Sequence, residues 1–246
     1  MARRKKLRLF GVPLRRRWIL AAGFVVAAYF LYGLPGLDNV KPLDTKPSIS
    51  ILASDGTMIA RYGGMRGDIV PLKGMPDHLV AAVISIEDRR FYRHFGIDPV
   101  GLARAIWTNI KARAWVQGGS TITQQLAKNM FLTPDKTLRR KVQEALMALQ
   151  IEYKFSKDEI LAAYLNRVYF GSGAYGIDAA AKTYFSKEAR DLSLWESAML
   201  AGLLKAPSRF SPASNPDLAK KRANVVIEAM KDAGYIDAKT TAREIK

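Results

Sequence analysis

The sequence predicts a mainly α-helical protein with a short β-hairpin before the helical part. From about residue 77 onward, apolar residues recur at intervals of three and four in one segment after another, which is the spacing of a helix face. Proline and glycine separate these segments, and no internal repeat of about 20–50 residues is evident. With 246 residues, 49% of them apolar and 25% charged, the chain can build one core with appendages.

The first 37 residues predict a basic cytoplasmic tail, residues 1–17, and a transmembrane anchor, residues 18–37. The tail holds eight of the Arg and Lys residues and no acid, so the net charge of +17 less these 8 leaves +9 for the rest. The following uncharged run is about as long as a membrane-crossing helix, with Trp18 and Tyr32 near its ends. The alternative is a cleaved signal peptide. The apolar run directly after the basic cluster argues against nucleic-acid binding.

Residues 38–69 predict a linker followed by the β-hairpin. The first part is polar and contains Pro42 and Pro47, which is typical of a linker. Apolar residues then alternate on both sides of Ser54-Asp55-Gly56, a turn sequence. Residues 70–232 are predicted to form the main domain, and residues 233–246 a segment that leaves it.

Within the main domain, the periodicity predicts eight helices in order. They lie near residues 79–86, 100–110, 122–130, 138–155, 157–169, 176–184, 193–205 and 217–233. Ser156 and Glu159 predict a capping box, and Gly234 a helix stop. Gly171, Gly173 and Gly176 spell a dinucleotide motif, but a helix precedes them where that motif needs a strand, so we expect a tight helix–helix connection.

Three polar blocks inside this apolar sequence predict an enzyme. They are EDRRFYRHFG at 87–96, GGSTITQQLAKN at 118–129 and RRKVQE at 139–144. Together with the helix between the first two, they bring two carboxylates and several cations within 58 residues: Glu87, Glu144, Arg104, Lys128, Arg140 and Lys141. This combination suits acid–base chemistry on an anionic substrate.

Each block also has a plainer interpretation. Glu87 closes an apolar helix, where partial desolvation would raise its pKa and suit a general base, but it could equally be a surface acid. The Gly-Gly-Ser-Thr start of the second block could bind an anion at a helix N-terminus, or simply cap the helix. Arg140 and Glu144, at i and i+4, could be a solvated ion pair. With two His and no Cys, we expect no zinc site and take His94 as structural.

Taken in order, the motifs resemble those of glycosyltransferase family 51. This is the peptidoglycan glycosyltransferase domain of class A penicillin-binding proteins and of monofunctional transglycosylases. Besides the first two blocks, the resemblance rests on RRKVQEALMALQIE, on KDEILAAYLNRVYFGSGAYGIDAAAKTYFSK and on LSLWESAMLAGLLKAPSRFSP. It covers residues 70–232 and implies a lysozyme-like helical fold with a membrane-associated jaw lobe. The apolar residues of 107–115 and 131–132 could form that jaw, or could be core.

The resemblance also implies a reaction and a site. The family polymerises lipid II into β-1,4 glycan strands by inverting displacement of undecaprenyl diphosphate. Glu87 would be the general base and Glu144 the second carboxylate. The implied substrate-binding residues are Arg104, Ser120, Gln125, Lys128, Lys136, Arg140, Lys141 and Asn166. No cofactor is required, and a divalent cation, Mg or Mn, at the diphosphate is left open.

The expected partners are lipid II, the growing glycan strand, membrane lipids and other cell-wall synthesis proteins. The expected location is the bacterial inner membrane, with a single span and the catalytic domain on the periplasmic side. The hairpin and the last residues resemble the bifunctional class, so we expect the transferase part of a bifunctional penicillin-binding protein. Two alternatives stay open: a lysozyme-like glycan-cleaving enzyme, which would also use two carboxylates, and a non-catalytic cell-wall scaffold.

Overall fold

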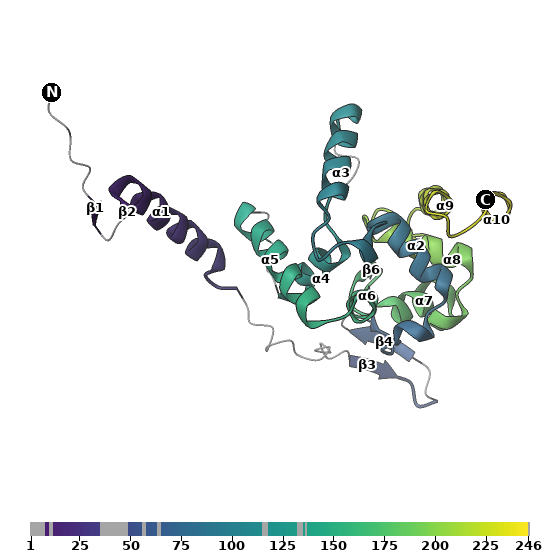
Figure 1. Cartoon of the computed structure of the whole chain (residues 1–246). Coiled ribbons are helices and arrows are strands. Elements are labelled where there is room, and N and C mark those ends of the chain that lie inside the picture. The colour runs from purple at the N-terminus through teal and green to yellow at the C-terminus, as the bar shows by residue number, and fades with distance from the viewer. Residues whose placement is uncertain are drawn as a thin grey trace, which may run out of the picture.

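The computed structural model describes residues 8–9, 12–34, 49–55, 58–62, 65–114, 118–131, 135 and 137–245. The described part is mostly helical, as predicted, and also contains a few short strands (Figure 1). The helices from residue 77 onward are α2 (Asp77–Glu87), α3 (Pro99–Ala112), α4 (Ile122–Phe131), α5 (Leu138–Lys154), α6 (Lys157–Leu165), α7 (Ile177–Phe185), α8 (Leu194–Leu203), α9 (Pro216–Asp232) and α10 (Ala238–Glu244). The first eight of these are the eight predicted helices.

The N-terminal part contains a two-residue strand pair, β1 (Arg8–Leu9) with β2 (Val12–Pro13), and then helix α1 (Leu14–Leu31). The anchor was predicted over residues 18–37, but α1 begins earlier and ends at Leu31. Its end coincides with a turn at Gly33, whose φ of 74° favours glycine. Among the described residues, no helix combines the length and the apolar character needed to cross a membrane.

The end of α1 is fastened to α5. The Arg139 guanidinium donates a hydrogen bond to the Tyr32 carbonyl at 2.6 Å and lies 4.9 Å from the centre of the Tyr29 ring. The Gln143 amide lies 3.3 Å from the carbonyls of both Phe30 and Tyr32. The last carbonyls of a helix have no partner within it, so these two side chains satisfy them.

The predicted hairpin is present as β3 (Ile49–Leu52) and β4 (Met58–Tyr62). The two strands are antiparallel, and Ile49 pairs with Tyr62. The chain then forms β5 (Met65–Arg66), which joins a third small sheet. The asparagine after α6 anchors the segment that follows β5, because its amide bonds both backbone groups of Val70.

The glycine-rich connection differs from its prediction. The helix expected over 157–169 ends at Leu165, and Tyr169–Gly171 form strand β6, which pairs with β7 (Ala174–Tyr175). Strand β5 lies parallel to β7 and completes a three-stranded sheet. Gly171, Gly173 and Gly176 all have positive φ, which the turn and the entry into α7 require. Strands this short carry no periodic signal, so the sequence predicted a helix connection instead.

The core is centred on α8, whose residues from Ser197 to Leu203 are buried. Helices α2 and α9 pack against α8 and against each other, while α4 packs against α5 and α6. Helix α6 starts at the predicted Ser156–Glu159 capping box, and α9 ends just before Gly234, which has a φ of 82°.

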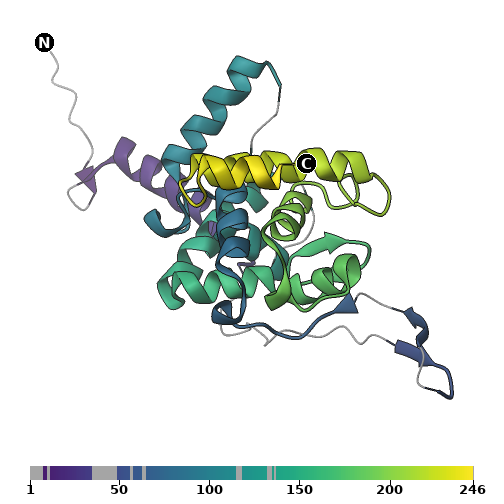
Figure 2. The ribbon, with the colours of Figure 1, turned by 90° about the vertical axis from the view of Figure 1, so that its right-hand side faces the viewer.

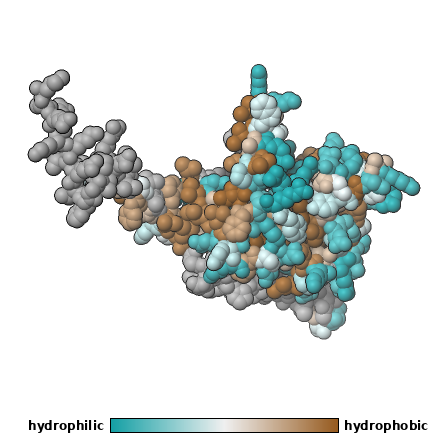
Figure 3. Space-filling view, viewed as in Figure 1, coloured by the Kyte–Doolittle hydropathy of each residue, from teal (hydrophilic) through white to brown (hydrophobic). Residues whose placement is uncertain are grey.

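Helix α3 projects away from this body of helices (Figures 1 and 2). It exposes a set of large apolar side chains: Val100, Leu102, Ile106, Trp107 and Ile110. Apolar surface is visible on the side of α3 that faces α1 and on α1 itself (Figure 3). The fold therefore has a packed body, one projecting helix and an N-terminal helix attached through α5.

Candidate active site

A cleft of about 710 Å³ lies where α2, α3, α4 and α9 meet. Five cationic side chains line it: Arg89, Arg104, Lys128, Lys205 and Arg222. The carboxylates that line it are Glu87, Asp88 and Asp98. The cleft is therefore rich in positive charge, which suits an anionic ligand.

Glu87 is the last residue of α2, and its partly buried side chain faces the cleft. Its Oε2 accepts a hydrogen bond from Gln125 Nε2 at 2.8 Å. Burial raises the pKa of Glu87, while the Gln125 bond and the charges of Arg222 and Lys205 oppose the rise. A carboxylate whose pKa is raised toward neutrality is a better proton acceptor than an ordinary one.

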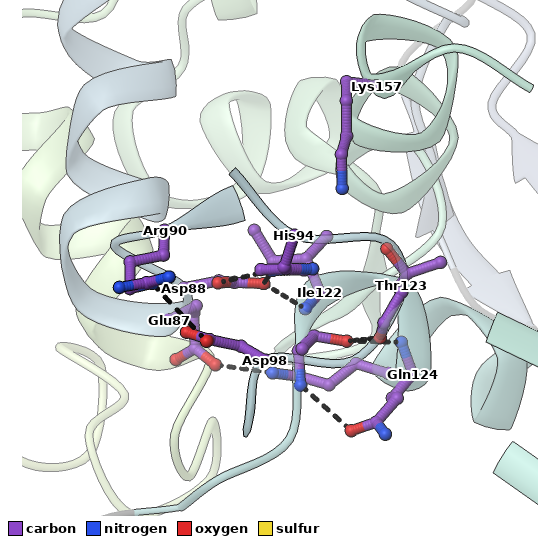
Figure 4. Close-up of polar contacts among 12 residues, drawn as sticks. Glu87, Asp88, Arg90, His94, Asp98, Ile122, Thr123, Gln124 and Lys157 are labelled. Carbon is purple, nitrogen blue, oxygen red and sulfur yellow. Dashed lines mark hydrogen bonds and ion pairs between the residues drawn. The ribbon is translucent and has the colours of Figure 1, made fainter. Parts of the chain in front are cut away.

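The neighbouring Asp88 has a structural role. Both of its carboxylate oxygens lie 3.0 Å from His94 Nε2, and Oδ2 also accepts a hydrogen bond from the backbone N–H of Ile122 at 3.0 Å (Figure 4). The Thr121 hydroxyl donates to the Gly96 carbonyl at 2.6 Å. These contacts tie the end of α2 to the start of α4, and His94 is structural, as predicted.

The start of α4 does not offer its backbone to an anion in the way that the glycine block suggested. The Ile122 N–H is bonded to Asp88, and the Gln124 N–H to Thr121 Oγ1 at 3.1 Å. The Gln124 side chain in turn accepts a hydrogen bond from the Thr121 N–H at 3.1 Å, which completes a reciprocal cap. These backbone N–H groups are therefore already bonded, and the positive charge of the cleft comes from its side-chain cations.

Glu144 lies on α5 and is only 2% exposed. It pairs with Arg140 one turn earlier and with Lys141, whose Nζ lies 2.7 Å from Glu144 Oε2. Lys141 Nζ also donates to Ser120 Oγ at 2.7 Å. Of these four residues only Ser120 lines the cleft, so the second carboxylate reaches it through Lys141 and Ser120.

The structure thus brings together Glu87, Arg104, Ser120, Gln125 and Lys128, and connects Arg140, Lys141 and Glu144 to them. Lys136 lies outside the described residues.

Asn166 does not line the cleft. It borders a separate apolar cavity of about 320 Å³, and its amide holds the backbone of Val70.

The described residues contain no group of three His, Cys, Asp or Glu side chains that could hold a metal ion. The two acids beside Glu87 in the cleft are already engaged, Asp88 with His94 and Asp98 with Arg90 at 3.4 Å. These two acids are thus committed to other partners, and no metal is used in the mechanism proposed for this cleft.

Three of the cations in the cleft were not predicted: Arg89, Lys205 and Arg222. Arg89 and Lys205 lie inside two of the five family motifs, so the sequence could have indicated them as site residues. Arg222 lies on α9, a helix whose pattern indicated only core packing. Burial lowers the pKa of Arg222, and the charge of Glu87 opposes this lowering.

The family described as Transglycosylase matches residues 55–231. Penicillin-binding protein 1A of Aquifex aeolicus is 45% identical over 222 residues, covering 89% of this chain and 31% of that protein. Penicillin-binding protein 1A of Escherichia coli is 45% identical over 220 residues, covering 89% of this chain and 26% of the relative. The chain thus spans less than a third of the length of these relatives.

A crystal structure of penicillin-binding protein 1A from Haemophilus influenzae has the same fold. The TM-score is 0.50 at 24% sequence identity, covering 84% of this chain and 21% of that one. The family match extends over most of the sequence and includes every described residue of the cleft. The chain therefore belongs to the transglycosylase family, as the glycosyltransferase domain of a class A penicillin-binding protein, which confirms the family predicted from its five motifs.

Proposed function

We propose that this protein is a peptidoglycan glycosyltransferase that polymerises lipid II into β-1,4 glycan strands. The observation that carries the proposal is the Glu87 carboxylate, with its raised pKa, in a cleft lined by five cations. A base and a cationic surface are what the transfer of a sugar from a diphosphate carrier needs.

In this mechanism, Glu87 takes the proton from the 4-hydroxyl of the acceptor sugar. The hydroxyl oxygen then attacks the anomeric carbon of the donor, and the bond from that carbon to undecaprenyl diphosphate breaks. One displacement inverts the α-linked donor into a β-linked product. The diphosphate leaves as a stable anion, so no general acid is required.

The cations stabilise the negative charge that develops on the leaving diphosphate. Arg104 and Lys128 line the cleft on α3 and α4, and Lys141 is positioned beside Ser120. Buried Glu144 holds Arg140 and Lys141 in place on α5. In the proposed site, Glu144 therefore acts by orienting cations and not by exchanging a proton.

The proposed location is the bacterial inner membrane, with α1 contributing to the anchor and the catalytic domain in the periplasm. The exposed apolar residues of α3, with Trp107 69% exposed and Ile110 65%, would form the membrane-facing jaw. The names of the relatives support placing this chain as the transferase part of a bifunctional penicillin-binding protein. Other cell-wall synthesis proteins are proposed as partners.

Hydrolysis of a finished glycan strand is the competing reaction. A glycosidase has to protonate a sugar leaving group, so its second carboxyl must reach the reacting bond as an acid. Here Glu144 is buried and bonded to two cations, which favours the transferase. A non-catalytic scaffold would need none of these groups.

The test is polymerisation of purified lipid II by the detergent-solubilised chain, compared with Glu87→Gln. We expect glycan strands from the parent and a rate lower by about 10²–10⁴-fold in the variant, the usual contribution of a general base. Glu188→Gln is the matched control, because Glu188 is an exposed acid paired with Arg190 on the surface. Equal rates in parent and Glu87→Gln would remove Glu87 from its role, and cleavage of glycan strands would favour the hydrolase.

A further inference from the structure

The side-chain amide of Gln125 is held at both ends. Its Nε2 donates to Glu87 Oε2 at 2.8 Å, and its Oε1 accepts a hydrogen bond from the Tyr164 hydroxyl at 3.1 Å. An amide has one donor end and one acceptor end, so only one of its two flipped orientations makes both bonds. Gln125 therefore presents its NH₂ group, and not its carbonyl, to the carboxylate.

Tyr164 is well suited to fix this orientation. It lies on α6, which packs against α4, and its side chain is 0% exposed. Burial raises the pKa of the Tyr164 hydroxyl well above its usual range, and the charge of Glu87 adds to the rise. The hydroxyl consequently keeps its proton and stays a donor toward Gln125 Oε1.

Tyr164 does not itself reach the cleft. Among the described residues that line the cleft, Gln125 is its bonded contact. The ring of Tyr164 belongs to the hydrophobic core, and a phenylalanine ring would fill the same space without the hydroxyl. An effect of the hydroxyl on chemistry at Glu87 must therefore pass through the Gln125 amide.

We propose that Tyr164 is a positioning residue for the transfer reaction, holding Gln125 in the orientation that donates to the Glu87 carboxylate. The inference rests on the proposed role of Glu87 as the general base. Donation from the NH₂ group favours the ionised carboxylate, which is the form that accepts a proton. Without the hydroxyl the amide can rotate, and a flipped Gln125 would turn its carbonyl oxygen toward a negative charge.

The first test is the pH dependence of kcat/KM for lipid II polymerisation by the full chain, parent against Tyr164→Phe. Activity falls with decreasing pH as Glu87 takes up a proton. Weaker stabilisation of its ionised form moves this fall to higher pH. We expect a loss of about five-fold on the acidic side, the size of one typical hydrogen bond, and little loss on the basic side. A fall at the same pH as in the parent would overturn the proposal.

Two further variants separate this effect from a general loss of packing. Tyr184→Phe is the matched control, because its hydroxyl bonds to Phe170 O and Ser172 Oγ, each at 3.1 Å, outside the cleft lining. Its pH profile should match the parent. If Tyr164 acts through Gln125, adding Tyr164→Phe to Gln125→Leu should slow the enzyme no further. If the rate loss of the double variant equals the product of the two single losses, the proposal is contradicted.

A second measurement does not depend on catalysis. The titration of the Glu87 carboxyl carbon can be followed by ¹³C NMR without substrate, in the parent and in Tyr164→Phe. We expect the variant to titrate at higher pH, and an unchanged titration would overturn the positioning role. A shifted titration together with an active Glu87→Gln enzyme would support the positioning role while removing Glu87 as the base.

Discussion

Glu87 and Asp88 are neighbouring carboxylates in different environments. Glu87 ends α2 and turns into the cleft, whereas the backbone of Asp88 leaves the helix with a φ of −157°. Asp88 therefore directs its carboxylate toward His94 and Ile122, where its bonds are satisfied. Glu87 accepts a hydrogen bond from Gln125, and burial acts against its charge. One carboxylate of the pair holds the fold, and the other faces the cleft, as the proposed general base must.

The raised pKa of Glu87 has a consequence for stability. In the unfolded chain Glu87 titrates in its ordinary range, at about pH 4.3, and in the folded protein it titrates higher. Between these pH values the unfolded state loses its proton first, so the free energy of unfolding falls as the pH rises. Above the pKa of Glu87 in the folded protein, the buried charge lowers the free energy of unfolding by its full amount. Below the pKa of Glu87 in the unfolded chain, this cost is absent.

We therefore expect Glu87→Gln to unfold at a higher temperature than the parent at neutral pH, although we expect it to be the slower enzyme. The difference should vanish below about pH 4, where the parent is also uncharged at this position. Thermal unfolding followed by circular dichroism at several pH values would measure it, with Glu188→Gln as the exposed control. A lower melting temperature at neutral pH would show that the charge of Glu87 stabilises the fold.

At the scale of elements, the glycine hairpin between α6 and α7 provides a sharp comparison. Gly173 and Gly176 both have positive φ, 77° and 87°. A Cβ at Gly173 would meet nothing within 4 Å, but one at Gly176 would lie 2.6 Å from the Asn166 carbonyl oxygen. Gly176 thus needs glycine for its conformation and for the close approach to the end of α6.

Gly173→Ala should lower the free energy of unfolding by about 1–2 kcal/mol, the strain of a positive φ on alanine. Gly176→Ala should lower it by more, because the Asn166 backbone must also move. Chemical denaturation of both variants would measure the difference. Equal destabilisation would mean that the contact with Asn166 relaxes freely.

The end of α1 is attached to α5. Arg139 and Gln143 bind the last carbonyls of α1, and the same first turns of α5 carry Arg140, Lys141 and Glu144. The N-terminal helix is therefore joined to the helix that places the second carboxylate.

Replacing both Arg139 and Gln143 by alanine should loosen the end of α1 while leaving the body folded. Two or more lost hydrogen bonds, each of about 1 kcal/mol, should speed amide exchange at residues 28–34 by about ten-fold or more. Hydrogen exchange with mass spectrometry would detect this. Gln150→Ala, at an exposed position of α5, is the control and should leave this exchange unchanged. Unchanged exchange in the double variant would place the attachment elsewhere.

At the scale of the whole molecule, regular helices and local motifs could be predicted from the sequence, and contacts between distant segments could not. The eight predicted helices have clear apolar periodicity, and Glu87, Gln125 and Lys128 stand in dense polar blocks. The β6–β7 pair is too short to have a period, and α10 has a polar sequence. Arg222 enters the cleft only because α9 packs against α2, a pairing that no local pattern encodes.

The apolar surface of α3 leads to a prediction about the whole protein on a membrane. In vesicles containing brominated lipids, part of the tryptophan fluorescence should be quenched by contact with the acyl chains. Trp107→Phe should reduce the quenched part, because Trp107 is exposed on the projecting helix. Trp195→Phe should leave it unchanged, since Trp195 packs against the core. If the loss of Trp107 does not reduce the quenched part, the Trp107 face of α3 does not contact the bilayer.

Hydrogen bonds at its two ends also set the segment that carries α3 apart from the body. The chain leaves the body after Gly96 and returns at Thr121, and these two residues are bonded to each other at 2.6 Å. The hydrogen bond from the Ile122 N–H to Asp88 holds the next residue of the returning chain against the end of α2. A segment whose two ends are pinned side by side behaves as an insertion, and insertions at such points are well tolerated. A change in the length of the projecting segment would therefore leave Glu87 and Gln125 in their places on α2 and α4.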